Sequence, residues 1–181
     1  MAKVDWGLKF MYELLYPAVL GAGIVGMAMR LASDSSTTDP NFIARASLGL
    51  LFLVFFCASF MASKQGTYTP LAFWLDVVEV VLMFFGFYWL RLFSPECHDL
   101  LIEGLYVLLI ALIILQILWR KAVGVPLLRR VGLRVWAIFA LGLGLIYNNA
   151  CLFVTPAVTG ITAILIVYYA VGSASESKEQ N

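Results

Sequence analysis

The sequence predicts an all-α, polytopic transmembrane helix bundle with about six spans. Of its 181 residues, 62% are apolar and only 13% are charged, whereas a soluble domain is usually about 45–50% apolar and about 25% charged. The apolar residues also form long runs of about 20 residues, the length of helix that crosses a hydrocarbon core. Because lipid offers no hydrogen bonds to the backbone, such runs predict helices.

Short polar stretches separate the predicted spans, which together form one domain. The spans cover residues 10–31, 42–63, 70–93, 100–119, 131–147 and 151–172. We therefore expect a single transmembrane helical domain over residues 1–172. A short polar tail over residues 173–181 follows it, and we place this tail in the cytoplasm.

Turn-forming and charged residues mark the ends of the first four spans. The stretch 33–40, rich in Ser, Thr and Asp, ends the first span, and the segment 64–66 (Lys-Gln-Gly) ends the second. Pro70 opens the third span, since proline is well suited to the first turn of a helix. The polar segment 94–99 precedes the fourth span, and the basic linker 120–130 follows it.

The last apolar stretch, 131–172, is about twice as long as one span requires, so it must fold back on itself. Asn148 and Asn149 are the natural turn, because Asn tolerates turn geometry and an amide pair is costly in lipid. Pro156 then lies near the start of the sixth helix. A re-entrant loop over residues 148–156 is the alternative, and it would leave five spans.

Composition also excludes several classes of function. A net charge of +1 argues against a nucleic-acid partner, which requires a basic face. One His and three Cys, with no Cys-x-x-Cys pair, predict no metal site and no cofactor. An enzyme is weakly supported, because the lone His98 leaves few groups for acid–base or metal-assisted chemistry. Cys97 and Cys151 fall in outer loops, and the sequence does not decide whether they pair.

Lysine and arginine are unevenly distributed between the two sides of the predicted bundle. With the N-terminus inside, the outer side holds only Arg30, Arg45 and Arg91. The cytoplasmic side holds the other nine basic residues: Lys3, Lys9, Lys64, Arg120, Lys121, Arg129, Arg130, Arg134 and Lys178. By the positive-inside rule, we predict both termini in the cytoplasm, for a multi-pass protein of a bacterial plasma (inner) membrane.

This topology places four ionisable residues in the cytoplasmic half of the bundle. Asp76 and Glu79, three residues apart, share one helical face about two turns from the cytoplasmic end, and Glu13 and Arg134 lie in the same leaflet. Two carboxylates one turn apart in a span cannot both ionise cheaply, so one should stay protonated unless Arg134 or water compensates it. These four residues are candidates for an ion or proton path. Alternatively, the carboxylates only pair with Arg134 and hold helices together.

A second group of polar residues is expected near the outer side, at the ends of the helices. Arginines at helix ends usually extend to lipid headgroups, so we expect packing and anchoring there. This outer polar layer consists of Arg30, Arg45, Arg91, Glu103, Asn148 and Asn149.

Two classes of function remain. In the first, the chain is a channel or transporter subunit for protons, small cations or small solutes, with the face of Asp76 and Glu79 lining the path. In the second, it is a non-transporting scaffold or accessory subunit of a larger membrane complex. In both, the lipid bilayer surrounds it and it forms a homo-oligomer or joins other subunits. Gly21, Gly23 and Gly26 indicate close contact between helices.

Overall fold

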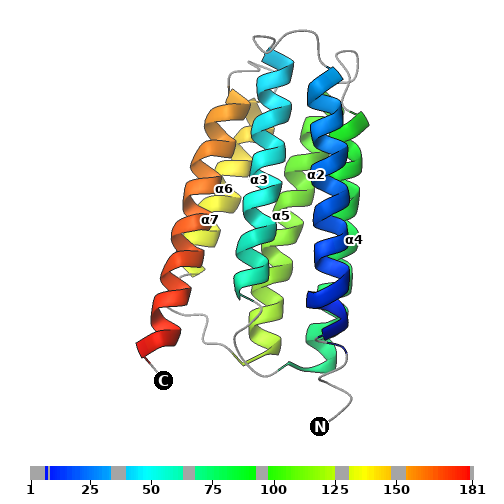
Figure 1. Ribbon diagram of the computed structural model, residues 1–181. Coiled ribbons are helices and arrows are strands. Elements are labelled where there is room, and N and C mark those ends of the chain that lie inside the picture. Colours follow the sequence, from blue (N-terminus) through cyan, green and yellow to red (C-terminus); the bar gives the residue numbers. More distant parts are fainter. Residues whose placement is uncertain are drawn as a thin grey trace.

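The computed structural model describes Gly7 and residues 9–33, 40–62, 68–92, 98–124, 131–147 and 154–179. Within them 97% of the residues are helical and none lies in a strand, which confirms the predicted fold class (Figure 1). A π-helical turn, η1, leads directly into the first of six α-helices. The elements are η1 (Phe10–Leu15), α2 (Tyr16–Ser33), α3 (Pro40–Ala62), α4 (Pro70–Leu92), α5 (His98–Ala122), α6 (Val131–Tyr147) and α7 (Val154–Glu179).

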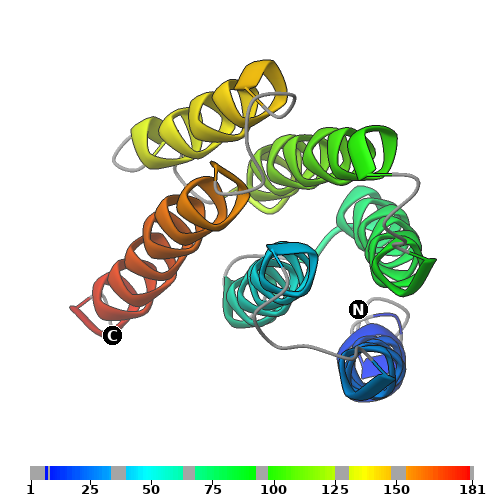
Figure 2. The ribbon, with the colours of Figure 1, turned by 90° about the horizontal axis from the view of Figure 1, so that it is seen from above.

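The six helices run alongside one another and form a ring when seen along their axes (Figure 2). Around the ring, α2 packs against α4, α4 against α5, α5 against α6, α6 against α7, α7 against α3, and α3 again against α2. A further contact between α3 and α4 crosses the ring. Both termini lie at the same end of the bundle, which we call the termini end (Figure 1).

Four helices are long and apolar enough to cross a membrane. Two shorter apolar helices, Gly132–Ile146 and Thr155–Tyr168, lie beside them. The four membrane-length segments are Phe10–Arg30, Phe42–Phe60, Pro70–Leu90 and Ile102–Ala122. The bundle is therefore compatible with a multi-pass membrane protein.

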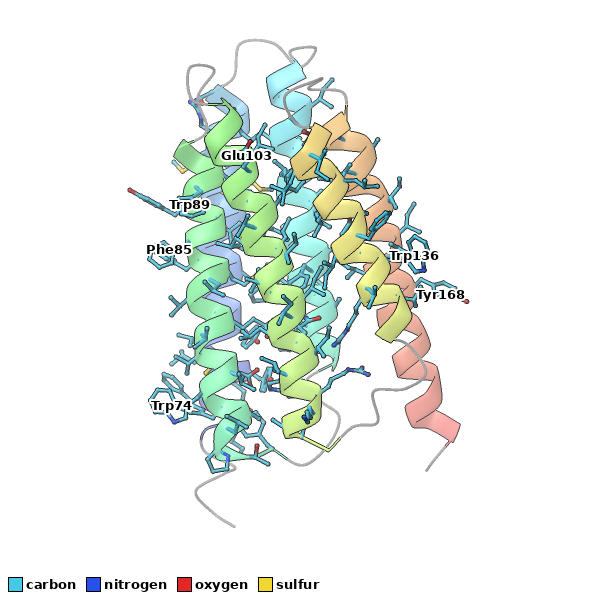
Figure 3. The ribbon with its side chains drawn as sticks, turned by 180° about the vertical axis from the view of Figure 1, so that it is seen from behind. Trp74, Phe85, Trp89, Glu103, Trp136 and Tyr168 are labelled. Atoms are coloured by element: carbon cyan, nitrogen blue, oxygen red, sulfur yellow. The ribbon has the colours of Figure 1, made fainter. Side chains whose placement is uncertain are left out.

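The outer surface of the bundle is apolar and aromatic. Trp74, Phe85, Trp136 and Tyr168 project away from it (Figure 3), and Tyr168 is 70% exposed. A surface of this kind suits hydrocarbon better than water, since monomeric soluble proteins rarely expose large contiguous apolar patches.

The C-terminal third of the chain forms two neighbouring helices, the second of which runs beyond the predicted span. Helices α6 and α7 pack side by side, as a fold-back requires, and the linker 148–153 between them lies outside the described residues. Pro156 is the third residue of α7, in the first turn, where its missing N–H leaves no helical bond unmade. However, α7 continues to Glu179, past the predicted end at residue 172. The segment 173–179 lacks Pro and contains Ala, Glu and Lys, which favour helix.

Local features position the residues around the start of α4. The Thr69 hydroxyl accepts a hydrogen bond from the Ala72 N–H at 3.1 Å, so Thr69 caps the helix that Pro70 opens. The same hydroxyl donates to the carbonyl of Ala122 at 3.4 Å, at the end of α5. Gly124 follows with φ of 75°, a backbone conformation that favours glycine. The termini ends of α4 and α5 are thereby held together.

The π-helical turn at the N-terminus has a covalent cause. Pro17 has no N–H to donate to the carbonyl four residues earlier, so the regular α-helical bond is missing there. The preceding backbone widens into η1 instead. Tyr12 lies within this turn, close to the termini end of the bundle.

Candidate functional site

A group of buried polar side chains lies inside the bundle near the termini end. We call it the polar cluster. Among the side chains that the structure describes, those of the cluster come from every helical element except α7, together with the segment before α4. Its members are Tyr12, Tyr16, Ser59, Tyr68, Asp76, Glu79, Gln116, Trp119, Arg120 and Arg134.

Asp76 accepts two hydrogen bonds at one carboxylate oxygen. The Tyr12 hydroxyl donates to Oδ2 at 3.0 Å, and the Tyr68 hydroxyl donates to the same atom at 2.7 Å. The Asp76 side chain is only 1% exposed. Burial and the neighbouring Asp76 charge raise the pKa of the Tyr68 hydroxyl well above its ordinary value. Tyr68 therefore keeps its proton and remains a donor.

Glu79 lies one turn further along α4, on the same face as Asp76, and is 2% exposed. The Ser59 hydroxyl on α3 donates a hydrogen bond to its Oε1. Arg134 on α6 acts on Glu79 electrostatically from the other side of the cluster. The spacing of three residues thus places both carboxylates in one buried site, where α3 and α6 meet them.

A small cavity separates the charged groups. Its volume is about 10 Å³, roughly the room that one water molecule needs. The cavity is lined by Ser59, Asp76, Glu79, Gln116, Trp119, Arg120 and Arg134. An organic solute is too large for this space, whereas a proton carried by water is not.

The charges around the cavity balance. Two carboxylates, Asp76 and Glu79, face two guanidinium groups, Arg120 and Arg134, and all four side chains are buried. Buried charges are tolerated when they are paired and hydrogen-bonded. A balanced set offers a metal cation little net attraction, because the two arginines already compensate the carboxylates.

Two uncharged members of the cluster have a buried donor with no hydrogen-bond partner within the described part of the chain. These donors are the Tyr16 hydroxyl and the Trp119 indole Nε1–H. Trp119 lines the cavity, and the Tyr16 ring stacks on Tyr12 with centroids 5.1 Å apart. Since a buried donor without a partner is costly, a water molecule in the cavity would stabilise the Trp119 N–H.

An apolar layer lies between the polar cluster and the opposite end of the bundle. Leu51 and Phe52 on α3, Met83 on α4, and Leu109 and Leu112 on α5 lie one to two turns beyond the cluster along their helices, and all are fully buried. All five of these side chains are apolar. A path across the bundle would therefore need a rearrangement of these side chains.

The other predicted residue of this half lies apart from the cluster. Glu13 is exposed, although it is next in sequence to Tyr12. The structure thus brings together Asp76, Glu79 and Arg134, and leaves Glu13 on the outer surface of the bundle.

The predicted outer residues occupy the opposite end. Arg45 is buried in the first turns of α3, and Glu103 is half-buried near the start of α5 (Figure 3). Arg30 is half-buried near the end of α2, where its Nη1 donates to Ser33 Oγ at 3.4 Å. Arg91 lies in the last turn of α4, but its side chain is outside the described residues. Asn148, Asn149, Cys97 and Cys151 also lie outside them.

Sequence reasoning missed all the uncharged members of the polar cluster. Tyr12 and Tyr16 are four residues apart and so share a helical face, a signal that is visible in the sequence. Tyr68 gives no such signal, because it precedes α4 and reaches Asp76 only through the fold. Arg120 was assigned to a basic linker, but it lies within α5 and is buried.

Comparison of the chain with protein-family models, with curated proteins and with solved structures finds no match. Within the described residues, no group of three or more His, Cys, Asp or Glu side chains is placed to hold a metal ion. The polar cluster itself is therefore the basis for a functional proposal.

Proposed function

We propose that this chain is an integral membrane protein that takes up protons at the polar cluster and passes them across the bilayer. The observation that carries the proposal is the pair Asp76 and Glu79, two carboxylates buried within one apolar span beside a cavity for about one water. Ionisable groups at such a depth are costly and usually functional. Replacement by apolar residues would serve packing at least as well.

The chemistry of the cluster favours protons over metal cations. Hydroxyl groups of Tyr12, Tyr68 and Ser59 contact the carboxylates directly, and a hydroxyl both donates and accepts, as a proton relay requires. Arg120 and Arg134 face the same space, so a metal cation would be repelled by two positive charges. The apolar layer beyond the cluster would then act as the closed gate.

Orientation is part of the proposal. Lys9, Arg120, Lys121 and Arg134 all lie towards the termini end, so the positive-inside rule places that end in the cytoplasm. The polar cluster would then exchange protons with the cytoplasm, and the apolar layer would separate it from the outer side of a bacterial plasma membrane.

A second function is supported by the balance of charge. If Asp76 and Glu79 only pair with Arg120 and Arg134, the cluster is a lock between helices of a non-transporting accessory subunit. The small size of the cavity and the buried apolar layer favour this alternative. The two proposals predict different proton flux and different folded yield when Asp76 and Glu79 are neutralised.

The test is proton flux in proteoliposomes, measured with an internal pH-sensitive dye under an imposed voltage. Asp76→Asn/Glu79→Gln should abolish the flux, because an amide cannot take up and release a proton. It should leave the folded yield nearly unchanged, because water that enters a conducting cavity would also solvate Arg120 and Arg134. Glu13→Gln, which removes an exposed carboxylate at the same end, is the matched control and should conduct as the parent does.

The lock predicts the opposite pattern. The double variant would strand buried cations at a cost of about 3–5 kcal/mol, so the folded yield should fall, and adding Arg134→Gln should partly restore it. Flux that persists in the double variant, or parent liposomes that conduct no protons at any pH or voltage, would reject proton transport.

A further inference from the structure

An apolar groove lies on the outer surface between α2 and α4, which are neighbours in the ring (Figure 2). Its volume is about 300 Å³, far larger than the cavity of the polar cluster. It is in the half of the bundle away from the termini end. The groove is lined by Val19, Ala22, Gly23, Gly26, Phe84, Phe87 and Tyr88.

The two sides of the groove differ in shape. On α4, the rings of Phe84 and Tyr88 stack nearly parallel, with centroids 6.5 Å apart and an interplanar angle of 11°, and form an aromatic wall. On α2, small residues form the floor. Gly23 packs against Phe87, since a Cβ there would lie 2.6 Å from its ring, but a Cβ at Gly26 would meet nothing within 4 Å. Thus Gly26 leaves room that no side chain of the described part fills.

A positive charge lies at one end of the groove. Arg30 follows Gly26 by four residues, so it lies on the same face of α2 one turn closer to the membrane surface. Arginine at this depth is well suited to a phosphate group, which its planar fork binds through charge-assisted hydrogen bonds. The groove therefore combines an apolar channel with a cation at its surface end.

We propose that this groove holds one acyl chain of a glycerophospholipid whose phosphate binds Arg30. The apolar and charged parts of this lipid match those of the site. Its acyl chain lies against Gly26 and the aromatic wall, and its phosphate lies at the end of α2. The groove and the cavity of the polar cluster share no lining residue, so the lipid site does not rest on the proposed proton transport.

Charge argues against a second copy of the chain as the occupant. Two copies that met symmetrically through this face would bring their Arg30 side chains towards the same axis. Like charges at close range repel each other, whereas a phosphate is attracted. The projecting rings of Phe84 and Tyr88, about half exposed, would also keep a partner helix from the glycine floor.

The test uses the full-length protein in detergent micelles that contain a trace of phosphatidylglycerol with a photoreactive acyl chain. Cross-links should map to residues 19–26 and 84–88. Gly26→Leu fills the groove and should reduce labelling roughly tenfold or more, the change expected when a specific contact is lost. Gly21→Leu is the matched control, because Gly21 is exposed, has nothing within 4 Å of its Cβ and does not line the groove.

The headgroup is tested by Arg30→Gln, which leaves the groove open. The number of lipids retained in native mass spectrometry should fall relative to the parent, and labelling should weaken by roughly tenfold. Equal labelling of the Gly26→Leu and Gly21→Leu variants would overturn the proposal. A dimer that dissociates on Gly26→Leu, with lipid labelling unchanged, would overturn it in favour of a second copy.

Discussion

The two tyrosine hydroxyls that donate to Asp76 test how the polar cluster is held together. Tyr12→Phe and Tyr68→Phe each remove one hydroxyl and keep the ring. Both hydroxyls reach the same atom, Oδ2, at 3.0 and 2.7 Å. Each single variant leaves this oxygen with one donor, whereas the double variant leaves a buried acceptor without either.

The expected magnitudes follow from the geometry. A hydrogen bond to a charged group contributes about 1.5–3 kcal/mol to stability when buried. Because both tyrosines are only partly buried, the free energy of unfolding of each single variant should fall by about 1–2 kcal/mol. Tyr68→Phe should lose more than Tyr12→Phe because its bond is shorter. The double variant should lose more than the sum of the two, by about 0.5–3 kcal/mol, because the residues share one partner.

The measurement is the free energy of unfolding of all four proteins in one fixed lipid–detergent mixture. Tyr168→Phe is the control, because this ring is 70% exposed and lies on α7, outside the polar cluster. A strictly additive double variant would show that the two hydroxyls do not act on a common acceptor. Single variants as stable as the parent would refute the claim that they stabilise Asp76 at all.

Three further predictions concern pH, packing and topology. Because the pKa of Tyr68 is raised in the folded protein, its contribution to stability is complete below its ordinary value of 10.0 and is lost as pH rises above that value; Tyr68→Phe should flatten the alkaline fall measured by unfolding titrations. A Cβ at Gly86 would lie 2.4 Å from a buried phenylalanine ring, whereas at Gly142 it would meet nothing within 4 Å. Gly86→Ala should therefore lower the free energy of unfolding by about 1–3 kcal/mol, and an equal effect of Gly142→Ala would contradict this. In a cysteine-free background, a membrane-impermeant thiol reagent added outside should label Ser33→Cys but not Lys121→Cys, and the reverse would reject the orientation.

The helices could be predicted from the sequence because each corresponds to a continuous apolar run between polar stretches. The predicted limits of the third span, 70–93, lie within one residue of α4, Pro70–Leu92. The predicted sixth span ends at residue 172, whereas α7 runs on beyond it, because hydropathy records where a chain leaves lipid and not where its helix stops. The polar tail keeps residues of good helix propensity, so α7 continues to Glu179.

The candidate site was predictable only in part. The spacing of Asp76 and Glu79 fixes their common face on one helix, and that is a local property. Their partners are not local. Ser59 precedes Glu79 by 20 residues and Tyr12 precedes Asp76 by 64, and neither pairing follows from periodicity. Glu13 shows the converse, because a position near the same end of the bundle does not determine which way a side chain faces.

The order of the helices in the sequence also determines when the charges of the polar cluster are compensated during synthesis. The ribosome releases α4, with both carboxylates, before α5 supplies Arg120 and before α6 supplies Arg134. Until Arg134 is added, the nascent chain holds two acidic groups in an apolar helix without both of their cations. Since Arg134 lies on α6, both carboxylates have a cation only once the fifth of the six described α-helices has emerged. A chain that is truncated before Arg134 therefore keeps an uncompensated carboxylate in its apolar interior.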